Sequence, residues 1–257
     1  MNILVTGHRG FIGSNLFKAL SKDHDVSGFD WVEGGFFPDI SKFDWVIHLG
    51  AISATTESDV EKIMKRNYDF SVKLFDACFD NAVNLQYASS AQLYGLGTNF
   101  KEDAPPDPRS PYAWTKYLFE RYVKQNDPGH ITVQGFRYFN VYGPGEEHKG
   151  NQASPFTKFR KQKEERGYIE VFAPAGKYKR DFVHVNDVVN YHLQFLKVEE
   201  NGVWNIGSGE PKSFLEIAQE IGGEIREVPV PENLRPWYQE WTCADMTKTR
   251  QTLDRYK

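Results

Sequence analysis

The sequence predicts an α/β protein with a doubly wound parallel (Rossmann) sheet, helices on both faces and a smaller C-terminal substrate lobe. The chain starts with a short apolar run, Asn2 to Thr6, which leads into closely spaced glycines and then an amphipathic helical pattern. Short apolar runs go on alternating with helical patterns, which is typical of βα units that build a parallel sheet. At 257 residues the chain can hold such a sheet and one added lobe.

The first predicted strand is followed by a turn with regularly spaced glycines. These are Gly7, Gly10 and Gly13, and the helical pattern continues through Leu20. A strand, a glycine-rich turn and a helix present backbone N–H groups at a helix N-terminus, where they can bind a pyrophosphate. An ordinary βα turn is the alternative, because a glycine series alone is a weak signal.

The second predicted strand, residues 25–29, is followed by Asp30. An acidic residue at this place accepts hydrogen bonds from an adenosine ribose and repels a 2′-phosphate, so Asp30 favours NAD over NADP. A capping role in a helix or turn is the alternative. The next segment, residues 31–42, is too short for a full helix and strand. We expect only a stub of strand there, at residues 36–37 and 39–40.

The rest of the chain continues the alternation. The expected strands are residues 44–49, 84–88, 131–137, 169–172, 182–185, 203–206 and 225–230. The expected helices are residues 58–79, 110–120, 152–166, 188–196, 213–221 and 242–253. We predict a dinucleotide-binding domain over residues 1–139, to which residues 182–207 return, and a substrate-binding lobe over residues 140–257.

Tyr112 and Lys116 are four residues apart in a helical pattern, so they share one helix face. A phenol loses its proton near pH ~10, so a base at neutral pH needs a shift of about three units, or roughly 4 kcal/mol. One ammonium about 4 Å away, at an effective dielectric constant of ~20, supplies about that much. The alternative is that Tyr112 packs and Lys116 is solvated. Ser90 would follow a strand, where it could share a proton with Tyr112 or cap a helix.

A long segment with glycines and prolines, residues 139–150, is expected to be a functional loop. It carries Lys149, which is a second acid/base candidate, a charge facing a phosphate or an ordinary surface lysine. Lys177, Lys179 and Arg180 cluster before a predicted strand. Together with Lys149 they could bind a diphosphate, or they could form a solvated cluster.

Composition limits the classes of partner. The net charge of −4 and the absence of a long basic tract argue against nucleic acid. No run of ~18 apolar residues predicts a membrane span. The two cysteines, Cys78 and Cys243, suggest neither a disulfide framework nor a Cys/His metal cluster, so we expect no metal site. A reducing, cytoplasmic setting is expected.

Taken together, these motifs resemble those of the extended short-chain dehydrogenases/reductases, which modify nucleotide-linked sugars. The resemblance rests on residues 6–13, 30, 49–51, 89–91, 112–116, 180–185 and 205–207. Within this family the chain is most similar to the ADP-L-glycero-D-manno-heptose 6-epimerases. That similarity rests on residues 53–57, 136–144, 147–150, 178–183, 238–239 and 244–246.

The resemblance implies roles for single residues. Tyr112 and Lys149 would be the two acid/base groups, Lys116 would tune Tyr112 and bind the nicotinamide ribose, and Ser90 would hold the reacting hydroxyl. The residues implied to bind the dinucleotide are Gly7, Gly10, Phe11, Ile12, Gly13, Asp30, Trp31, Asp39, Ile40, Leu49, Gly50, Ala51, Ser53, Asn67, Tyr112, Lys116 and Val141. The residues implied to bind the nucleotide-sugar are Ser90, Asn140, Lys149, Asn151, Lys158, Phe172, Arg180 and Tyr238.

The implied activity is nucleotide-sugar epimerisation by transient oxidation and reduction with a bound nicotinamide cofactor. NAD is expected, with NADP as the alternative, and the family implies a homo-oligomer. The chain departs from the heptose epimerases at Gly145, Asn151 and Lys158 and in its short segment after Asp30. The reaction type is therefore more firmly implied than the sugar.

Three other functions are the alternatives. A nucleotide-sugar 4,6-dehydratase would need an acidic residue beside Ser90, where the chain has Ala91-Gln92. A reductase that consumes NADPH is disfavoured by Asp30. A catalytically idle dinucleotide-binding protein would not need Tyr112 and Lys149 together.

Overall fold

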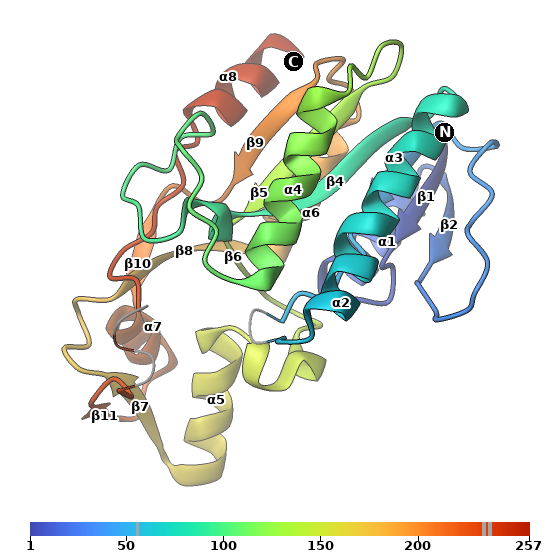
Figure 1. Ribbon diagram of the computed structural model, residues 1–257. Coiled ribbons are helices and arrows are strands. Elements are labelled where there is room, and N and C mark those ends of the chain that lie inside the picture. The colour runs from blue at the N-terminus through green and yellow to red at the C-terminus, as the bar shows by residue number, and fades with distance from the viewer. Residues whose placement is uncertain (55–56, 233–234, 236–237) are drawn as a thin grey trace.

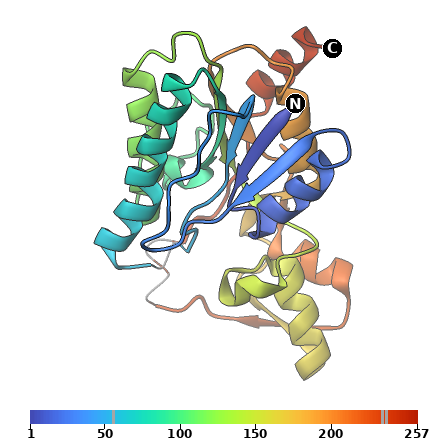
Figure 2. The ribbon, with the colours of Figure 1, turned by 90° about the vertical axis from the view of Figure 1, so that its right-hand side faces the viewer.

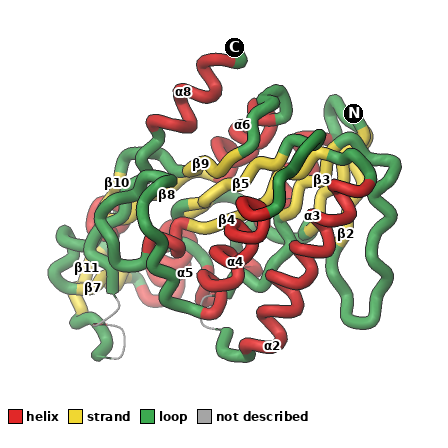
Figure 3. Tube along the Cα trace, turned by 45° about the horizontal axis from the view of Figure 1, so that its top comes forward, coloured by secondary structure: helices red, strands yellow, loops and turns green. Residues whose placement is uncertain are grey.

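The computed structural model describes residues 1–54, 57–232, 235 and 238–257, without the side chain of Asn151. Thr55 and Thr56, part of one stretch behind the resemblance, lie outside the described residues. The centre is a six-stranded parallel sheet in the order β2-β1-β3-β4-β5-β9 (Figures 1 and 3). Its strands are β1 (Asn2–Thr6), β2 (Asp25–Phe29), β3 (Trp45–His48), β4 (Asn84–Ser90), β5 (Val133–Tyr138) and β9 (Gly202–Ile206). The predicted doubly wound sheet is confirmed.

Helices cover both faces of this sheet. Viewed along the sheet, α1 (Phe11–Leu20) and α6 (Val185–Phe195) lie on one side (Figure 2). On the other side lie α2 (Val60–Ile63), α3 (Phe70–Asp80) and α4 (Pro111–Gln125). Because both faces are covered, the central strands β3, β4 and β5 are buried at nearly every position.

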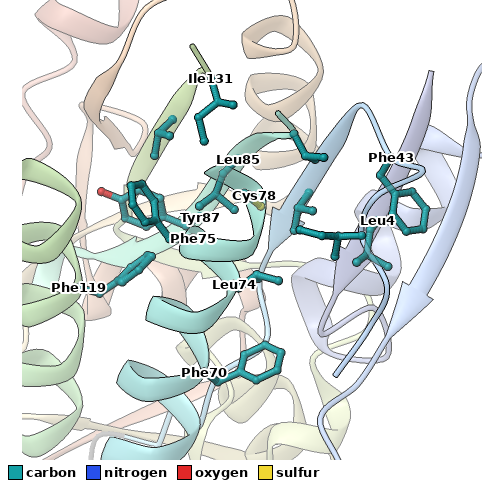
Figure 4. Packing of buried hydrophobic residues seen from close by; sticks show 14 residues of the cluster. Leu4, Phe43, Phe70, Leu74, Phe75, Cys78, Leu85, Tyr87, Phe119 and Ile131 are labelled. Carbon is teal, nitrogen blue, oxygen red and sulfur yellow. The ribbon is translucent and has the colours of Figure 1, made fainter. Parts of the chain in front are cut away.

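Alternation along the strands separates two cores. Ile3 and Val5 of β1 pack with Leu16 and Leu20 of α1, whereas Leu4 packs toward the opposite face. Figure 4 shows that opposite core, in which Leu74, Phe75 and Cys78 of α3 lie beside Leu85 and Tyr87 of β4, with Phe119 of α4. The predicted buried thiol at Cys78 is confirmed, since that side chain is fully buried.

The predicted stub of strand at residues 36–37 and 39–40 is wrong. The segment between β2 and β3 is a loop, in which Phe36 is 96% exposed and Ile40 is buried against the core. Pro38 has no N–H to donate to a strand ladder, and Gly34 takes a positive φ of 71° that turns the chain away from the sheet. The side chains of Trp31, Phe37, Ile40 and Phe43 anchor the loop to the core.

The predicted single helix over residues 58–79 is interrupted. A π-helical turn, η1 (Met64–Asp69), separates α2 from α3 and carries the buried Asn67. The side chain of Asn67 accepts a hydrogen bond from Ile52 N at 2.8 Å and donates one to Ile52 O at 2.9 Å. The π turn thus lies where the Asn67 side chain bonds to the segment that contains Ile52. Such π-bulges are frequent at functional sites.

The smaller lobe lies at one end of the large sheet (Figure 1). It contains a three-stranded sheet in the order β10-β8-β6 and the parallel pair β11-β7. These strands are β6 (Asn140–Tyr142), β7 (Tyr168–Phe172), β8 (Lys179–His184), β10 (Pro211–Ser213) and β11 (Glu224–Val228). Two helices pack on them, α5 (Pro155–Arg166) and α7 (Phe214–Ile221), around a core that includes Phe156, Phe159, Phe182 and Ile217.

The segment 139–150, predicted to be a loop, contains β6 and the start of a 3-10 turn, η3 (Glu147–Gln152). Residues 140–142 pair with β8 in register, Asn140 opposite Phe182. Three-residue strands such as β6 and β10 have no periodicity that a sequence pattern could reveal. A second short 3-10 turn, η2 (Ala91–Tyr94), follows β4 and is capped by the Ser90 hydroxyl, which accepts from Gln92 N at 3.2 Å.

The end of the chain returns to the large sheet. Within residues 182–207, β9 pairs with β5, with Trp204 opposite Phe136, whereas residues 182–184 belong to β8 of the small sheet. The last helix, α8 (Thr247–Arg255), also packs here, because Trp204 Nε1 donates to Thr252 Oγ1 at 2.9 Å. It therefore lies on the large sheet and not with the lobe. The domain boundary at residue 139 stays a prediction.

We expect the protein to lose stability as the pH falls below about 6.5. Burial lowers the pKa of both His48 and His192 to about 3. The unfolded chain takes up these protons near pH ~6.5 while the folded chain does not. The stabilisation is complete above that pH and is lost toward pH 3, at roughly 1.4 kcal/mol per pH unit for each histidine.

Urea unfolding between pH 6.5 and 5, where carboxylates contribute little, measures this slope. His192→Gln should remove about half of it. His130→Gln is the matched control, since His130 is exposed. Equal slopes in all three proteins would contradict the assignment to buried histidines.

A second prediction concerns the π turn. Asn67→Ala leaves the partly buried N–H and C=O of Ile52 without their partners and should lower the free energy of unfolding by about 1–3 kcal/mol. Asn81→Ala is the control, because Asn81 is exposed and bonds only to Ala77 O in its own helix. Urea denaturation of both variants tests this, and an equal cost at the two sites would refute it.

Candidate active site

A cleft of about 710 Å³ opens where the carboxyl ends of β4 and β5 meet the lobe. Parallel strands deliver their carboxyl ends to one edge, and Ser90 pairs in register with Tyr138 there. The predicted site residues that line the cleft are Phe11, Ile12, Ser53, Ser90, Tyr112, Asn140, Val141, Lys149, Lys158, Phe172, Arg180 and Tyr238. The fold therefore gathers residues that are far apart in the sequence around one space.

The glycine turn is built for close approach. Gly7 has a positive φ of 74°, and a Cβ there would lie 2.5 Å from Gly50 N. A Cβ on Gly13 would overlap Gly7 O, so only glycine fits. The helix α1 starts after Gly10, and no side chain of the described residues caps its first N–H groups. These free donors suit the pyrophosphate of a dinucleotide.

Asp30 also fits a dinucleotide. Its Oδ2 is buried and lies 2.9 Å from His8 Nδ1, but the two atoms are not aligned for a hydrogen bond, and neither has such a partner among the described residues. Arg9 Nε lies 3.5 Å from the same oxygen. The Asp30 side chain as a whole is 28% exposed at the end of β2, so its carboxylate can accept from a ribose hydroxyl.

The remaining residues predicted to bind the dinucleotide lie beside this edge without lining the cleft. Trp31 packs under the Arg66 guanidinium, whose Cζ lies 4.2 Å from the centre of the indole ring. Asp39 accepts from Ser41 N at 3.0 Å and Ser41 Oγ at 2.7 Å. The segment after β3, residues 49–53, is held by the two bonds of Asn67 to Ile52. Asn67 therefore bridges to backbone and is not solvated.

Tyr112 and Lys116 share a face of α4, as predicted. Tyr112 is partly accessible from the cleft, whereas Lys116 is buried behind it. Lys116 Nζ donates to Ala88 O at 2.8 Å and lies 5.9 Å from the centre of the Tyr112 ring. Burial lowers the pKa of Lys116 to about 8, against an opposing effect of Glu120.

The expected lowering of the Tyr112 pKa is wrong for this ligand-free site. Burial of the phenol raises its pKa, and a hydrogen bond with Ser90 offsets this only in part. Desolvation disfavours the charged phenolate, and the ammonium of Lys116 is directed at a backbone carbonyl. Tyr112 therefore carries its proton at neutral pH.

A buried ion pair, Arg137 with Glu120, lies near Lys116. Arg137 of β5 donates to both carboxylate oxygens of Glu120, at 3.0 and 2.6 Å, and Ser89 Oγ donates to the same group at 2.5 Å. A bidentate pair with an added hydroxyl is a well-satisfied arrangement for charges inside a protein. It connects α4, which carries Tyr112, to the two central strands.

Lys149 points into the cleft from η3. Its Nζ lies 5.2 Å from the centre of the Phe11 ring. Burial lowers the pKa of Lys149 and also that of Lys158, while the charge of Glu146 opposes the shift in both. Lys149 is therefore close to the glycine turn as well as to the substrate lobe.

The predicted cluster of Lys177, Lys179 and Arg180 does not converge on the cleft. Arg180 does line it, with the guanidinium Cζ 5.7 Å from the Phe214 ring and 5.3 Å from the Tyr238 ring. Lys177 is exposed and forms an ion pair with Glu240, and Lys179 is not among the lining residues. The alternation of β8 sends Lys179 and Arg180 to opposite faces.

Some lining residues carry no signal in the sequence. Gln92, Gln162, Glu170 and Phe214 line the cleft, and the buried Glu146 lies behind it. Each is an ordinary residue in a charged or apolar stretch, without a motif. The pair Ser154-Pro155, with Ser154 at the N-cap position and Pro155 in the first turn of α5, is the one sequence signal for this part of the cleft. It predicts the start of a helix there.

A larger cavity of about 910 Å³ lies on the other side of α4, between the loop of residues 101–106 and α8. Its charged lining is mixed in sign, and the buried pair at its base, Glu120 with Arg137, is already satisfied. The catalytic candidates Ser90, Tyr112 and Lys149 line the smaller cleft, so we place the site there.

Within the described part of the chain, no three His, Cys, Asp or Glu side chains are grouped as metal ligands. No helix in that part is long and apolar enough to span a membrane.

Comparison with known proteins agrees with this geometry. The crystal structure of ADP-L-glycero-D-manno-heptose-6-epimerase from Helicobacter pylori superposes with a TM-score of 0.85 at 26% identity, over 100% of this chain and 90% of that chain. UDP-N-acetylglucosamine 4-epimerase from Methanobrevibacter ruminantium, in complex with UDP-N-acetylmuramic acid, has a TM-score of 0.86 at 25% identity, over 98% and 91%. UDP-glucuronic acid 4-epimerase from Bacillus cereus, in complex with NAD, has a TM-score of 0.81 at 26% identity, over 100% and 93%.

A family profile matches more than half of the chain. It covers residues 34–207 and describes the NAD dependent epimerase/dehydratase family. Together with the glycine turn, the free acceptor of Asp30 and the Tyr112–Lys116 helix, this match identifies the chain as a member of the NAD-dependent epimerase/dehydratase family.

Proposed function

We propose that this protein is a nucleotide-sugar epimerase that works by transient oxidation and reduction with bound NAD. One observation carries the proposal: two proton-transfer groups from different elements, the phenol of Tyr112 on α4 and the amine of Lys149 on η3, line the same cleft. Two such groups would let the enzyme serve both poses of the sugar, because the reacting oxygen loses a proton in one pose and regains it in another.

The chemistry of the substrate explains this need. The C–H bond of an unactivated carbinol is not acidic, so simple deprotonation cannot invert the centre. Bound NAD would supply the oxidation and the return reduction at that carbon. The protein has to hold the sugar in two poses and move a proton at the oxygen in each.

The two groups are suited to divide this task. Burial raises the pKa of Tyr112 and lowers the pKa of Lys149. The Tyr112 phenol thus keeps its proton and is suited to donate, whereas the Lys149 amine loses its proton more easily than an ordinary lysine and is suited to accept. Ser90 lies beside Tyr112 and would hold the reacting hydroxyl, and Lys116 would bind the ribose of the cofactor.

The choice of NAD over NADP follows from Asp30. Its partly exposed carboxylate would accept from a ribose hydroxyl, and its charge would repel a 2′-phosphate. The solved relatives include a UDP-glucuronic acid 4-epimerase in complex with NAD. Arg9 beside Asp30 is a positive charge that leaves NADP as the alternative.

A nucleotide-sugar is the proposed substrate because the lobe wall is cationic. Arg180 between the rings of Phe214 and Tyr238, together with Lys158, offers charge to a diphosphate and flat surfaces to a base. ADP-D-glycero-D-manno-heptose is the first candidate, because the chain is similar to the Helicobacter pylori enzyme.

We also propose that the protein is a homo-oligomer and that it acts in the cytoplasm.

The competing functions are less well supported. A 4,6-dehydratase would need a carboxylate beside Ser90, and Glu170 on the lobe strand β7 is the one acidic residue among the described residues that line the cleft. A reductase would turn over only with free NADPH. An idle binding protein would not need buried Lys116 behind Tyr112.

The decisive experiment is an NMR time course in D2O with purified protein, ADP-D-glycero-D-manno-heptose and no added cofactor. We expect the C6 epimer without deuterium at C6, because the hydride never leaves the bound cofactor. Deuterium at C6 would mean enolisation and would overturn the mechanism. If no reaction occurs but nicotinamide cofactor is recovered from the denatured protein, the heptose is wrong and other nucleotide-sugars take its place.

A matched pair of variants tests the role of Tyr112. Tyr112→Phe should reduce kcat by about 10²–10⁴-fold, since one acid/base group is lost. Cofactor binding, followed by fluorescence, should be retained. Tyr117→Phe is the control, because Tyr117 lies on the same helix and its hydroxyl accepts only from Arg121, at 3.4 Å. Full activity in Tyr112→Phe would exclude the phenol as a catalytic group.

A further inference from the structure

Glu146 is a carboxylate with no exposed surface, in the segment between β6 and α5. It accepts hydrogen bonds from Ser154 N at 2.8 Å, Ser154 Oγ at 2.6 Å and Thr157 Oγ1 at 2.8 Å. Gly143 N approaches the same group at 3.4 Å. No ion pair satisfies it within the described residues, so neutral donors hold the charge.

These contacts tie both ends of one segment to a single group. Gly143 lies just after β6, whereas Ser154 and Thr157 belong to the start of α5. The chain between them curls around the carboxylate, and Lys149 N donates to the backbone oxygen of Glu146 at 2.9 Å. A buried charge at the N-terminus of α5 is also favoured by the helix dipole.

The segment held in this way forms a wall of the cleft. Lys149, Ser154 and Lys158 line the cleft, whereas Glu146 does not. Gly150, in the middle, takes a positive φ of 51°, and no described atom lies within 4 Å of the place that a Cβ would occupy there. The segment therefore has little packing at that point, and the Glu146 carboxylate ties its two ends together.

We propose that Glu146 is a positioning residue: its buried carboxylate ties residues 143–157 together and so holds the Lys149 amine over Phe11 at the cleft. The proposal rests on the proposed function for its effect on turnover, but not for its effect on the segment. The side chain of Glu146 contacts none of the groups assigned to catalysis.

The charge has a second consequence. Burial lowers the pKa of Lys149 and of Lys158, and the negative charge of Glu146 opposes that shift in both. A glutamine has one acceptor oxygen in place of two and no charge. Glu146→Gln should thus loosen the segment and lower the pKa of Lys149 further.

The neighbouring residue supplies a matched control. Glu147 is exposed, and Glu147→Gln removes the same charge one position along the chain. Two readouts need no substrate. Amide hydrogen exchange, followed by mass spectrometry, reports on residues 143–157, and acetic anhydride labelling of Lys149 as a function of pH reports the pKa of its amine.

In Glu146→Gln we expect exchange in residues 143–157 to accelerate at least about fivefold, as the net loss of one hydrogen bond implies. The labelling midpoint of Lys149 should move to lower pH, and the acid limb of kcat/KM, which reports deprotonation of the proton acceptor, should move with it. Glu147→Gln should match the wild type in all three. Wild-type exchange and an unshifted Lys149 midpoint in Glu146→Gln would overturn the proposal.

Thr157→Val covers the case in which Glu146→Gln fails to fold. It removes one donor to the carboxylate and leaves the charge in place, so exchange should accelerate while the Lys149 midpoint stays. No acceleration would count against the tether. Lys149→Met separates the two proposals: if it keeps full turnover, the catalytic role of Lys149 fails, and the exchange data still decide the role of Glu146.

Discussion

The parallel register of the central strands is the constraint on which the site depends. Because β1, β3, β4 and β5 run in the same direction, their carboxyl ends meet at one edge, and Ser90 lies opposite Tyr138 there. The glycine turn after β1 and the segment after β3 reach the same edge, where Gly7 and Gly50 pack too closely for any side chain. A shift of one strand by one residue would turn its side chains to the other face and separate these groups.

Buried polar groups fasten the loops to that edge. Asn67 holds the segment after β3, the pair of Glu120 and Arg137 ties α4 to the sheet, and Glu146 anchors the segment that carries Lys149. Asn67 and Glu120 bond to partners 15 and 17 residues away, whereas Glu146 bonds to partners within its own segment and at the start of α5. Loops held in this way can position catalytic groups more reproducibly than loops anchored only by apolar contact, because hydrogen bonds are directional.

The environment of Tyr112 depends on a competition between burial and charge. The spacing of Tyr112 and Lys116 is correct for one helix face, but the ammonium donates to Ala88 O and burial raises the phenol pKa. Burial acts on Lys116 in the opposite sense and lowers its pKa. The site thus holds a protonated phenol near an amine whose pKa is about 8, and a reaction that transfers protons in both directions can use both groups.

By itself, the sequence determined the class of fold, the glycine turn, the acidic residue after β2 and the helix with Tyr112 and Lys116, because these follow from local periodicity and from fixed spacings along one element. Only the tertiary structure decided that Asn67 sits in a π turn, that Lys177 pairs with Glu240 outside the cleft, and that Glu146 is buried behind Lys149. Burial and partners across the fold depend on segments distant in sequence, and no local pattern records them. The same reason explains why the short strands β6 and β10 escaped prediction: they exist through pairing with β8.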